Sequence, residues 1–393
     1  MPHDESRRQF LRYLAASPLL VTPQSTRRYA GLGDGLITEP EHAINVFDFE
    51  PVAESVLPPA HWGYLKTSVD DDATLRRNRE GFSHYQLRPR RLIDVRRVDM
   101  SIEIFGKRWP TPIVIAPTGG NQAFHPEGAV AVARAARAKD HLQMLSTVAS
   151  LSIEDVIEAR GEPVWFQLYP RYDWTQTLKM VKRAEAAGCP AIALTVDNTM
   201  GSNRETVKRF AKLEERDCSV CHTAERVRPM LEGLEAIENS DYARSVDWEF
   251  VRRLRDATSM KVLIKGIVRG DDAELAVDNG VDGIIVSNHG ARAVASDRST
   301  IECLPEIVTA VRGRILVLVD SGFRRGTDFF KALALGADAV CIGRPYLWGL
   351  ASFGQAGVEA VLDLLRAELE LVMRQAGTTS IAQIEPSHII AKP

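Results

Sequence analysis

The chain has 393 residues, of which 45% are hydrophobic and 26% are charged. This composition is typical of a globular protein and excludes a disordered or collagen-like chain. The formal net charge of −3 lacks the basic excess of general nucleic-acid-binding proteins. No apolar run reaches the roughly 18 residues that a membrane-spanning helix needs, and five cysteines are too few for a disulfide scaffold.

The first 45 residues are expected to form a loosely ordered N-terminal segment. Ser6–Arg12 (SRRQFLR) has a twin-arginine pattern, and a short apolar stretch follows from Tyr13 to Val21. Charged residues before a short apolar segment are typical of export signals that a receptor reads. One prediction is therefore export of the folded protein to the bacterial periplasm. The alternative is an amphipathic or frayed basic terminus on a cytoplasmic protein.

A helical segment is expected over Asn45–Leu75, and short apolar runs then alternate with helical patterns. Buried parallel strands read as continuous apolar runs because both faces are covered, and strand–helix alternation forces parallel pairing. The sequence therefore predicts an α/β protein, a (β/α)8 TIM barrel over residues 46–390 with an N-terminal helical extension. The predicted strands are Ile113–Ala116, Gln143–Ser146, Val164–Leu168, Ala191–Thr195, Val262–Lys265, Gly283–Ser287, Ile315–Val319 and Ala339–Ile342; helices are predicted over Gly128–Lys139, Trp174–Ala187, Asp271–Asp278 and Gly326–Leu335.

The interval between the fourth and fifth predicted strands is about twice as long as most others. We interpret residues 198–246 as an inserted loop, polar and irregular from Met200 to Ser245. Long loops within a compact domain are usually functional. This loop leaves from the carboxyl end of strand 4, where TIM barrels assemble their active sites.

The ends of the last two predicted strands carry glycine and arginine together. Gly322 and Arg324 follow the seventh strand, and Gly343 and Arg344 follow the eighth. Glycines let the backbone approach a ligand, arginines offer fixed donor forks, and TIM barrels often bind phosphate at these two loops. Because turns use glycine anyway, each loop alone is a weak signal. Ser146, Gln167 and Thr195, at other strand ends, add hydrogen-bonding groups for a ring, so the sequence predicts a phosphorylated planar cofactor.

Ser287–Arg292 (SNHGAR), at the end of the sixth predicted strand, carries the candidate chemistry. His289 can act as a general base, since an unperturbed imidazole titrates near pH ~6.5. Arg292, three residues on, can bind a carboxylate, and Asp197 can pair with the imidazolium. A lone histidine in a barrel loop is more often a satisfied polar residue, but its neighbours here favour a catalytic role.

These motifs together resemble those of the FMN-dependent α-hydroxy-acid oxidase/dehydrogenase family, which includes glycolate oxidase, lactate oxidase, mandelate dehydrogenase and the flavin domain of flavocytochrome b2. The resemblance runs from about Phe47 to Ile389. The motifs that carry it are Ala116-Pro117-Thr118, Gln167-Leu168-Tyr169, Leu194-Thr195-Val196-Asp197, Ile264-Lys265-Gly266, Ser287–Arg292 and Ile342-Gly343-Arg344-Pro345.

The resemblance implies that the protein oxidises a small L-2-hydroxy acid, like lactate, glycolate or mandelate, to the 2-oxo acid. FMN is the implied cofactor, and oxygen, a quinone or a cytochrome is the implied electron acceptor. His289 is implied to be the base with Asp197 as its partner, and Tyr169 to hydrogen-bond the substrate hydroxyl. Arg292 and Arg204 are implied to bind the substrate carboxylate, assisted by Tyr64.

For the cofactor, the resemblance implies that Lys265 lies at the flavin N1/O2 edge, where a cation stabilises negative charge on the ring. Arg324 and Arg344 are implied to hold the phosphate, and a homo-oligomer, tetrameric by analogy, is expected. The other implied cofactor-binding residues are Pro117, Thr118, Gly119, Ser146, Gln167, Thr195, Ser287, Asp320, Gly322 and Gly343.

Three positions depart from the family pattern. Ser321 stands where many relatives have the middle residue of Asp-Gly-Gly, which tightens the turn and leaves the phosphate site in place. Arg204 lacks the neighbouring arginine of some relatives. Val148 stands where glycolate oxidase has a pocket tryptophan, so the pocket can take a different side chain and the substrate's size stays open.

Cys218, Cys221 and His222 have the Cys-x-x-Cys-His spacing of a c-type haem attachment site. Haem c is one prediction, and it agrees with export; a disulfide, a metal clip or coincidence are the alternatives. The other three cysteines lie in apolar contexts and are expected to be packing residues. No other metal site is predicted.

Two further readings of the whole chain stay open. Tyr346–Leu350 (YLWGL) resembles mycofactocin-maturation flavoenzymes, which would make the substrate peptide-derived. The other is an electron-transfer flavocytochrome without its own substrate. The combination of His289, Arg292, Arg204 and Tyr64 favours a free hydroxy acid.

Overall fold

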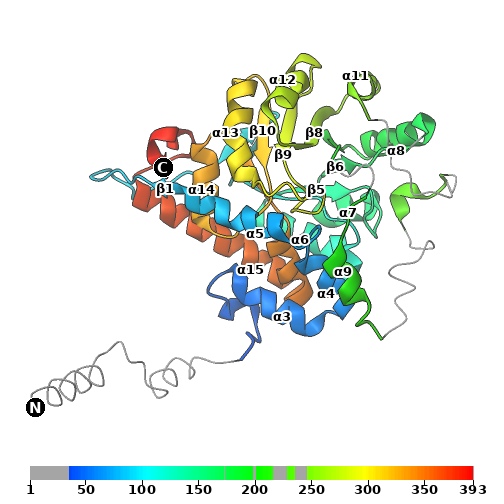
Figure 1. Ribbon diagram of the computed structural model, residues 1–393, viewed down its shortest axis with the longest axis horizontal. Coiled ribbons are helices and arrows are strands. Elements are labelled where there is room, and N and C mark those ends of the chain that lie inside the picture. The colour runs from blue at the N-terminus through cyan, green and yellow to red at the C-terminus, as the bar shows by residue number, and fades with distance from the viewer. Residues whose placement is uncertain (1–34, 172, 198–200, 216–227, 235–245, 393) are drawn as a thin grey trace, which may run out of the picture. The chain divides into compact units, whose positions relative to one another are not determined.

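The computed structural model describes residues 35–171, 173–197, 201–215, 228–234 and 246–392. The chain divides into Met1–Thr38 and a compact unit, Glu39–Pro393, and the second is described here. In its described part, eight parallel strands close into a barrel in the order β10-β11-β4-β5-β6-β7-β8-β9, with helices around it (Figure 1). The predicted (β/α)8 barrel is therefore confirmed.

The barrel strands lie close to their predicted positions, and the fifth is longer at both ends. Most of their residues are buried on both faces, because helices cover the outside and side chains fill the interior. The observed strands are β4 (Ile113–Ile115), β5 (Leu142–Ser146), β6 (Trp165–Leu168), β7 (Ala191–Thr195), β8 (Lys261–Ile267), β9 (Gly283–Val286), β10 (Leu316–Val319) and β11 (Ala339–Ile342).

Two small sheets outside the barrel were not anticipated. Strands β2 (Ile102–Ile104) and β3 (Lys107–Trp109) form a hairpin whose Ile104 and Trp109 join the interior core cluster of the barrel. Phe105, in its turn, stacks on Trp165 with ring centroids 5.4 Å apart. Strand β1 (Tyr85–Leu87) pairs antiparallel with β12 (Ile389–Ala391), near the end of the chain.

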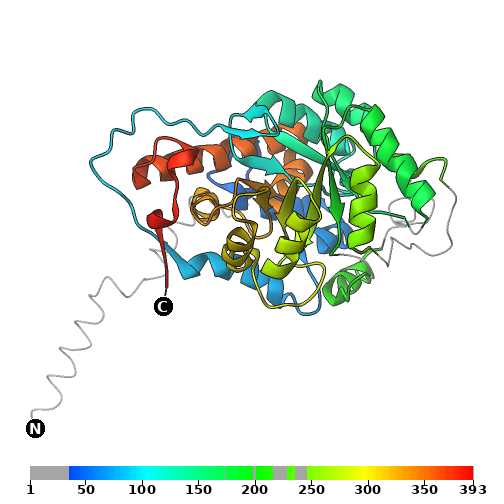
Figure 2. The same cartoon turned by 90° about the horizontal axis from the view of Figure 1, so that it is seen from above.

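The expected helices are present, and the last helix of the barrel, α15, is long. Helix α15 packs along α6 and α14 (Figures 1 and 2) and is broken at Phe353–Gly354. A Cβ on Gly326 would lie 2.3 Å from the Glu368 carbonyl carbon, so only glycine lets α14 approach α15 this closely. The barrel helices are α6 (Gly128–Lys139), α7 (Ile153–Arg160), α8 (Trp174–Ala186), α11 (Trp248–Asp256), α12 (Gly270–Asp278), α13 (Thr300–Val311), α14 (Gly326–Ala334) and α15 (Arg344–Ala376).

The helical extension before the barrel is also confirmed. It contains α3 (Phe49–Val56), α4 (Pro59–Lys66) and α5 (Ala73–Glu80). Asn45 begins it with a capping box, in which its side chain accepts a hydrogen bond from the Phe47 amide. Tyr64 lies in the last turn of α4, which ends at Lys66, and lines the site described below.

The expectation that residues 200–245 are irregular is wrong in part. Helix α9 (Glu205–Ala211) and a 3-10 turn (Pro229–Leu231) lie within this interval. Phe210 of α9 packs against Gly63 of α4. The contact is so close that a Cβ on Gly63 would lie 2.3 Å from the Phe210 Cβ. Helix α9 has only seven residues, about two turns, which is too short for its apolar residues to show a helical period in the sequence. Tertiary packing on α4 stabilises the helix instead.

Two sequence predictions concern residues outside the described part of the chain. These are the twin-arginine segment Ser6–Arg12 and the haem motif of Cys218, Cys221 and His222. Among the residues that are described, no helix is long and apolar enough to cross a membrane. Cys189, Cys303 and Cys341 are buried and unpaired, in agreement with the predicted packing role.

Candidate active site

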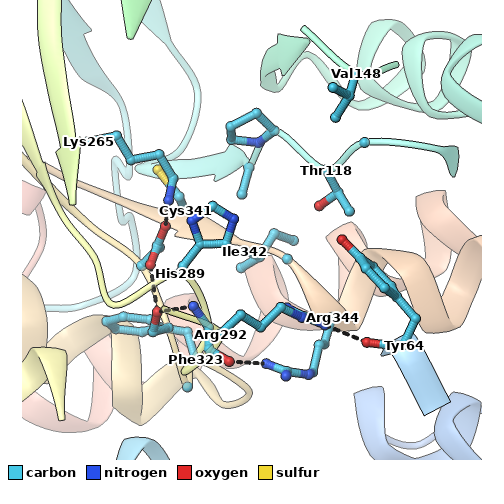
Figure 3. Close-up of a pocket in the computed structure, with 18 of the residues that line it drawn as sticks. Tyr64, Thr118, Val148, Lys265, His289, Arg292, Phe323, Cys341, Ile342 and Arg344 are labelled. Atoms are coloured by element: carbon cyan, nitrogen blue, oxygen red, sulfur yellow. Dashed lines mark hydrogen bonds and ion pairs between the residues drawn. The ribbon is translucent and has the colours of Figure 1, made fainter. Parts of the chain in front are cut away.

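Two adjoining cavities open at the carboxyl ends of the barrel strands. The inner cavity lies among the loops after β4 and β8–β11 (Figure 3), and the outer cavity lies between these loops, α4 and α9. The residues that line both cavities are Tyr64, Gly119, Val148, Tyr169, His289 and Arg292. Four of the residues that the sequence assigned to chemistry, Tyr64, Tyr169, His289 and Arg292, thus lie at the junction of the two cavities.

His289 is placed there by a left-handed turn directly after β9. His289, Gly290 and Ala291 have φ values of 58°, 64° and 66°, which non-glycine residues seldom adopt. Hydrogen bonds hold the turn: the His289 amide donates to Ser287 Oγ (3.0 Å), and the Ala291 amide donates to Asn288 Oδ1 (2.9 Å). Such over-determined backbone strain is typical of functional sites.

The imidazole of His289 lies between an acid and a phenol. Its Nδ1 is 2.7 Å from Asp197 Oδ1 and its Nε2 is 3.1 Å from the Tyr169 hydroxyl. Burial would raise the Asp197 pKa, but His289 and Lys265 outweigh it, so the pKa lies below its usual value. An ionised carboxylate only accepts hydrogen bonds. It therefore keeps the proton on Nδ1 and leaves the Nε2 lone pair toward Tyr169 and the cavity.

Arg204 and Arg292 converge on the same side of this junction. Each donates from Nη2 to the Tyr64 carbonyl, at 3.1 Å and 3.0 Å. Their guanidinium carbons lie 4.7 Å and 5.2 Å from the centre of the Tyr64 ring. The Nε of each arginine is buried without a hydrogen-bond partner. Two unpartnered cationic donors on one wall fit a carboxylate.

Burial lowers the pKa values of both Arg204 and Arg292. Burial and then the charge of Arg292 lower the pKa of Arg204 to about 10, and burial lowers that of Arg292. Since arginine stays protonated in proteins, the lowered values express the cost of burying two like charges without an anion. An anionic ligand would offset this cost.

Lys265 is the buried cation beneath the inner cavity. Its Nζ donates to Ser287 Oγ (2.8 Å) and lies 3.2 Å from Asp320 Oδ2. Burial lowers its pKa, but Asp320 and Asp197 raise it more, so the Lys265 pKa lies above its usual value. The lysine therefore stays charged and can face an electron-rich ring edge.

Ser321, which follows Asp320 after β10, connects this cation to the histidine loop. It has a φ of 77°, and its hydroxyl accepts from the Gly290 amide (3.0 Å) and donates to Asp320 Oδ1 (2.6 Å). These two hydrogen bonds offset the cost of a left-handed serine. The inner-cavity loops after β9 and β10 are thus joined directly.

The far end of the inner cavity is strongly basic. Arg344 donates to the carbonyls of Leu65, Gly290 and Thr67 at 2.8–3.0 Å. Arg324 donates to the Phe323 carbonyl. Burial and the nearby Arg79 lower the pKa of Arg324 to about 9.

The charges around the inner cavity do not balance. Among the described residues that line it, four are permanently cationic and one is a carboxylate, Asp320. Burial and neighbouring arginines also hold the Arg344 pKa well below its usual value. This donor set fits an anionic cofactor with a phosphate. The four cations are Lys265, Arg292, Arg324 and Arg344.

The other sequence-predicted cofactor residues divide into two groups. Pro117, Thr118, Gly119, Gly322 and Gly343 line the inner cavity. The second group, Ser146, Gln167 and Thr195, is buried at the strand ends and is not among the residues that line the inner cavity. In it, Ser146 Oγ donates to Gln167 Oε1 and Gln167 Nε2 donates to Thr195 Oγ1, both at 2.9 Å.

One supporting residue was missed by the sequence analysis. Asn78 of α5 exchanges two side-chain hydrogen bonds with Asn288, at 3.0 and 2.8 Å. It also packs against the β10 loop, where a Cβ on Gly322 would lie 2.1 Å from the Asn78 carbonyl oxygen. Nothing in the sequence near Asn78 indicates a partner 210 residues away.

Comparison with known proteins agrees with this geometry. Residues 53–391 match the FMN-dependent dehydrogenase family. The chain is 42% identical over 351 residues to glycolate oxidase 3 of Oryza sativa subsp. indica, covering 88% of this chain and 96% of the relative. It is 41% identical over 360 residues to glycolate oxidase of Spinacia oleracea, covering 88% and 95%.

Solved structures with the same fold include a soluble mutant of the membrane-associated (S)-mandelate dehydrogenase from Pseudomonas putida. It matches with a TM-score of 0.83 and 34% identity over 89% of this chain and all of that one. A double mutant of flavocytochrome b2 with pyruvate bound matches with a TM-score of 0.81 and 33% identity, over 94% and 91% of the two chains.

Proposed function

Because the chain belongs to the FMN-dependent dehydrogenase family, as an FMN-dependent 2-hydroxy-acid oxidase or dehydrogenase, we propose that it oxidises an L-2-hydroxy acid to the 2-oxo acid with His289 as the base. The observation that carries this proposal is the hydrogen-bonded chain Tyr169–His289–Asp197 beside two buried arginine Nε–H groups. A carboxylate, a hydroxyl and a base are what this reaction needs in one place.

FMN fits the inner cavity by charge and by donor type. Arg324 and Arg344 would hold its phosphate, Lys265 would face its ring, and Pro117–Gly119 would form a wall against it. Bound FMN would supply the acceptor for the two electrons that leave the hydroxy acid. Burial and neighbouring arginines lower the pKa values of Arg324 and Arg344, and this cost, which an anionic ligand would offset, supports the assignment.

The substrate is held at the junction of the cavities. Arg204 and Arg292 bind its carboxylate through the donors that have no partner in the protein. This places the α-hydroxyl toward Tyr169 and the Nε2 of His289. As the H–C–O–H unit of the acid becomes C=O, His289 takes up one of its two hydrogens as a proton, and the other hydrogen leaves together with the two electrons, for which bound FMN would be the acceptor. The ionised Asp197 stabilises the imidazolium that forms.

The test is anaerobic bleaching of the FMN-loaded protein. (S)-lactate, glycolate and (S)-mandelate are added separately under argon, and the flavin absorbance is followed with the 2-oxo product. Bleaching with stoichiometric 2-oxo acid is expected for at least one acid. If none of the three, and no longer-chain 2-hydroxy acid, bleaches the flavin, the proposed activity is wrong.

The electron acceptor is a separate part of the proposal. Oxygen, a quinone and a cytochrome are the three candidates, and turnover with each in turn distinguishes them. If the enzyme is exported, as Ser6–Arg12 suggests, a quinone or cytochrome is favoured. A Soret band that survives acid–acetone extraction would identify haem c on Cys218, Cys221 and His222.

A peptide-derived substrate is the second candidate function. The two buried arginine donors favour a free carboxylate over a peptide chain. The bleaching experiment also tests this alternative, because a small free acid would fail to reduce a peptide-specific enzyme.

A further inference from the structure

The outer cavity is larger than a small hydroxy acid requires. Its volume is about 500 Å³, within the range of roughly 300–1,000 Å³ that is typical of sites for drug-sized ligands. Glycolate or lactate, held at Arg204 and Arg292, would fill only the end next to His289. The rest of the cavity extends from this junction toward α4 and α9.

Small residues keep the outer cavity open near its junction with the inner cavity. Val148 lies directly over Gly119, where a Cβ would come within 2.3 Å of Val148 Cγ2. Gly120, Ala123 and the apolar Phe124 also line the cavity. This part of the cavity fits methylene groups of a substituent on the α-carbon.

The outer part of the cavity is cationic. Lys208 and Arg228 line it in addition to the two arginines that would hold the α-carboxylate. Lys208 lies one helical turn after Arg204 in α9, so both side chains can face the same space. No aspartate or glutamate is found among the described residues that line the outer cavity.

The carboxylates near Lys208 are directed elsewhere. Glu205 accepts from Asn203 Nδ2 (3.1 Å) and lies 3.8 Å from Arg209. Asp72 is bound by the amide and hydroxyl of Ser68. The Nζ of Lys208 donates instead to a neutral acceptor, Asn203 Oδ1, at 3.3 Å. Its charge therefore remains available to a ligand.

We propose that the preferred substrate is a 2-hydroxy acid whose substituent ends in a second anionic group, which Lys208 recognises across an apolar spacer. This inference rests on the proposed function for the α-carboxylate end. It adds that the enzyme is selective for hydroxy diacids over 2-hydroxy acids of the same length whose substituent is uncharged.

The experiment compares matched substrate pairs. Malate, 2-hydroxyglutarate and 2-hydroxyadipate, all in the (S) form, are each paired with the amide of the distal carboxylate, which has nearly the same shape. The rate constant for anaerobic flavin bleaching divided by the apparent Kd is measured for each. For at least one pair the diacid is expected to be favoured about tenfold, as one charge-assisted contact would give. This preference should fall with added salt.

Charge reversal assigns the preference to the residue. Lys208→Glu should remove it, giving a diacid-to-amide ratio of one or below. Lys212→Glu is the matched control at the end of the same helix, exposed and outside the cavity lining, and should keep the ratio. Wild-type ratios near one for all three pairs, or equal ratios in the two variants, would overturn the proposal.

A binding measurement separates this inference from the proposed activity. Calorimetric titration with 2-oxoglutarate and its distal amide reports recognition of the second carboxylate without turnover. Tighter binding of 2-oxoglutarate that Lys208→Glu abolishes supports the inference even if no acid bleaches the flavin. Bleaching by lactate with equal binding of the two oxo acids supports the activity and rejects the inference.

Discussion

The inner and outer cavities meet at His289 but are built in different ways. Residues at the ends of the barrel strands line most of the inner cavity, and hydrogen bonds such as Ser321 to Gly290 join one loop to the next. The outer cavity is lined by loops after the barrel strands and also by segments added to the barrel, among them α4 and α9, which pack on each other. We therefore expect changes in the inner cavity to affect cofactor binding and changes in the added segments to affect substrate selection.

The strongest test of this division is at the junction itself. His289→Ala should leave the bound FMN in place while slowing flavin bleaching by a hydroxy acid by roughly 10²–10⁴-fold or more, since general base catalysis contributes this much. FMN content is measured by absorbance and bleaching by anaerobic stopped flow. Exposed His42, in the N-terminal extension, gives the control His42→Ala. Near-normal bleaching in His289→Ala would show that another group is the base.

A change confined to the inner cavity should affect the cofactor. Arg324→Ala is expected to raise the Kd for FMN by about 10–100-fold, since a charge-assisted hydrogen bond contributes roughly 1.5–3 kcal/mol. The neighbouring Arg325→Ala is the control, because that side chain pairs with Glu368 at the surface. Fluorescence titration of apoprotein measures both. Equal FMN affinity in the two variants would place the phosphate elsewhere.

A change confined to the outer cavity should affect the substrate alone. Arg204→Lys keeps the charge but loses the planar donor fork, so the KM for the hydroxy acid should rise about tenfold at unchanged FMN content. Arg209→Lys, on the exposed side of α9, should leave the KM as it is. A large loss of FMN in Arg204→Lys would contradict the division between the two cavities.

The smallest expected effect tests whether α4 and α9 act as a unit. Gly63→Ala places a methyl group against Phe210, and overpacking of this kind costs roughly 1–3 kcal/mol. We expect α9 to shift, the KM to rise a few-fold and FMN binding to persist. The double variant Gly63→Ala/Phe210→Ala should bring the KM back toward that of Phe210→Ala. Strictly additive effects of the two changes would argue against this contact.

The same division explains what the sequence could and could not predict. The barrel strands were located because buried parallel strands read as continuous apolar runs, and the inner-cavity residues follow them directly. Tyr64 and Arg204 were assigned only through the family resemblance. The structure brings them together, with the Arg204 guanidinium over the Tyr64 ring.

Local sequence patterns could not predict contacts between residues that are far apart in the chain. Helix α9 is too short to show a period and depends on packing against Gly63. Asn78 acts through Asn288, far along the chain. The pairing of β1 with β12 joins two three-residue strands that have no signal of their own.

The position of β11 and α15 at the end of the chain has a consequence for biosynthesis. Arg344 is the last residue along the described chain that lines the inner cavity, and β11 must pair with β4 to close the barrel. A nascent chain therefore cannot assemble the basic end of the inner cavity until β11 and Arg344 have left the ribosome. Long-range closure of this kind is slow. Retention of FMN should therefore report that translation has passed Arg344, and chains terminated before this residue should emerge colourless.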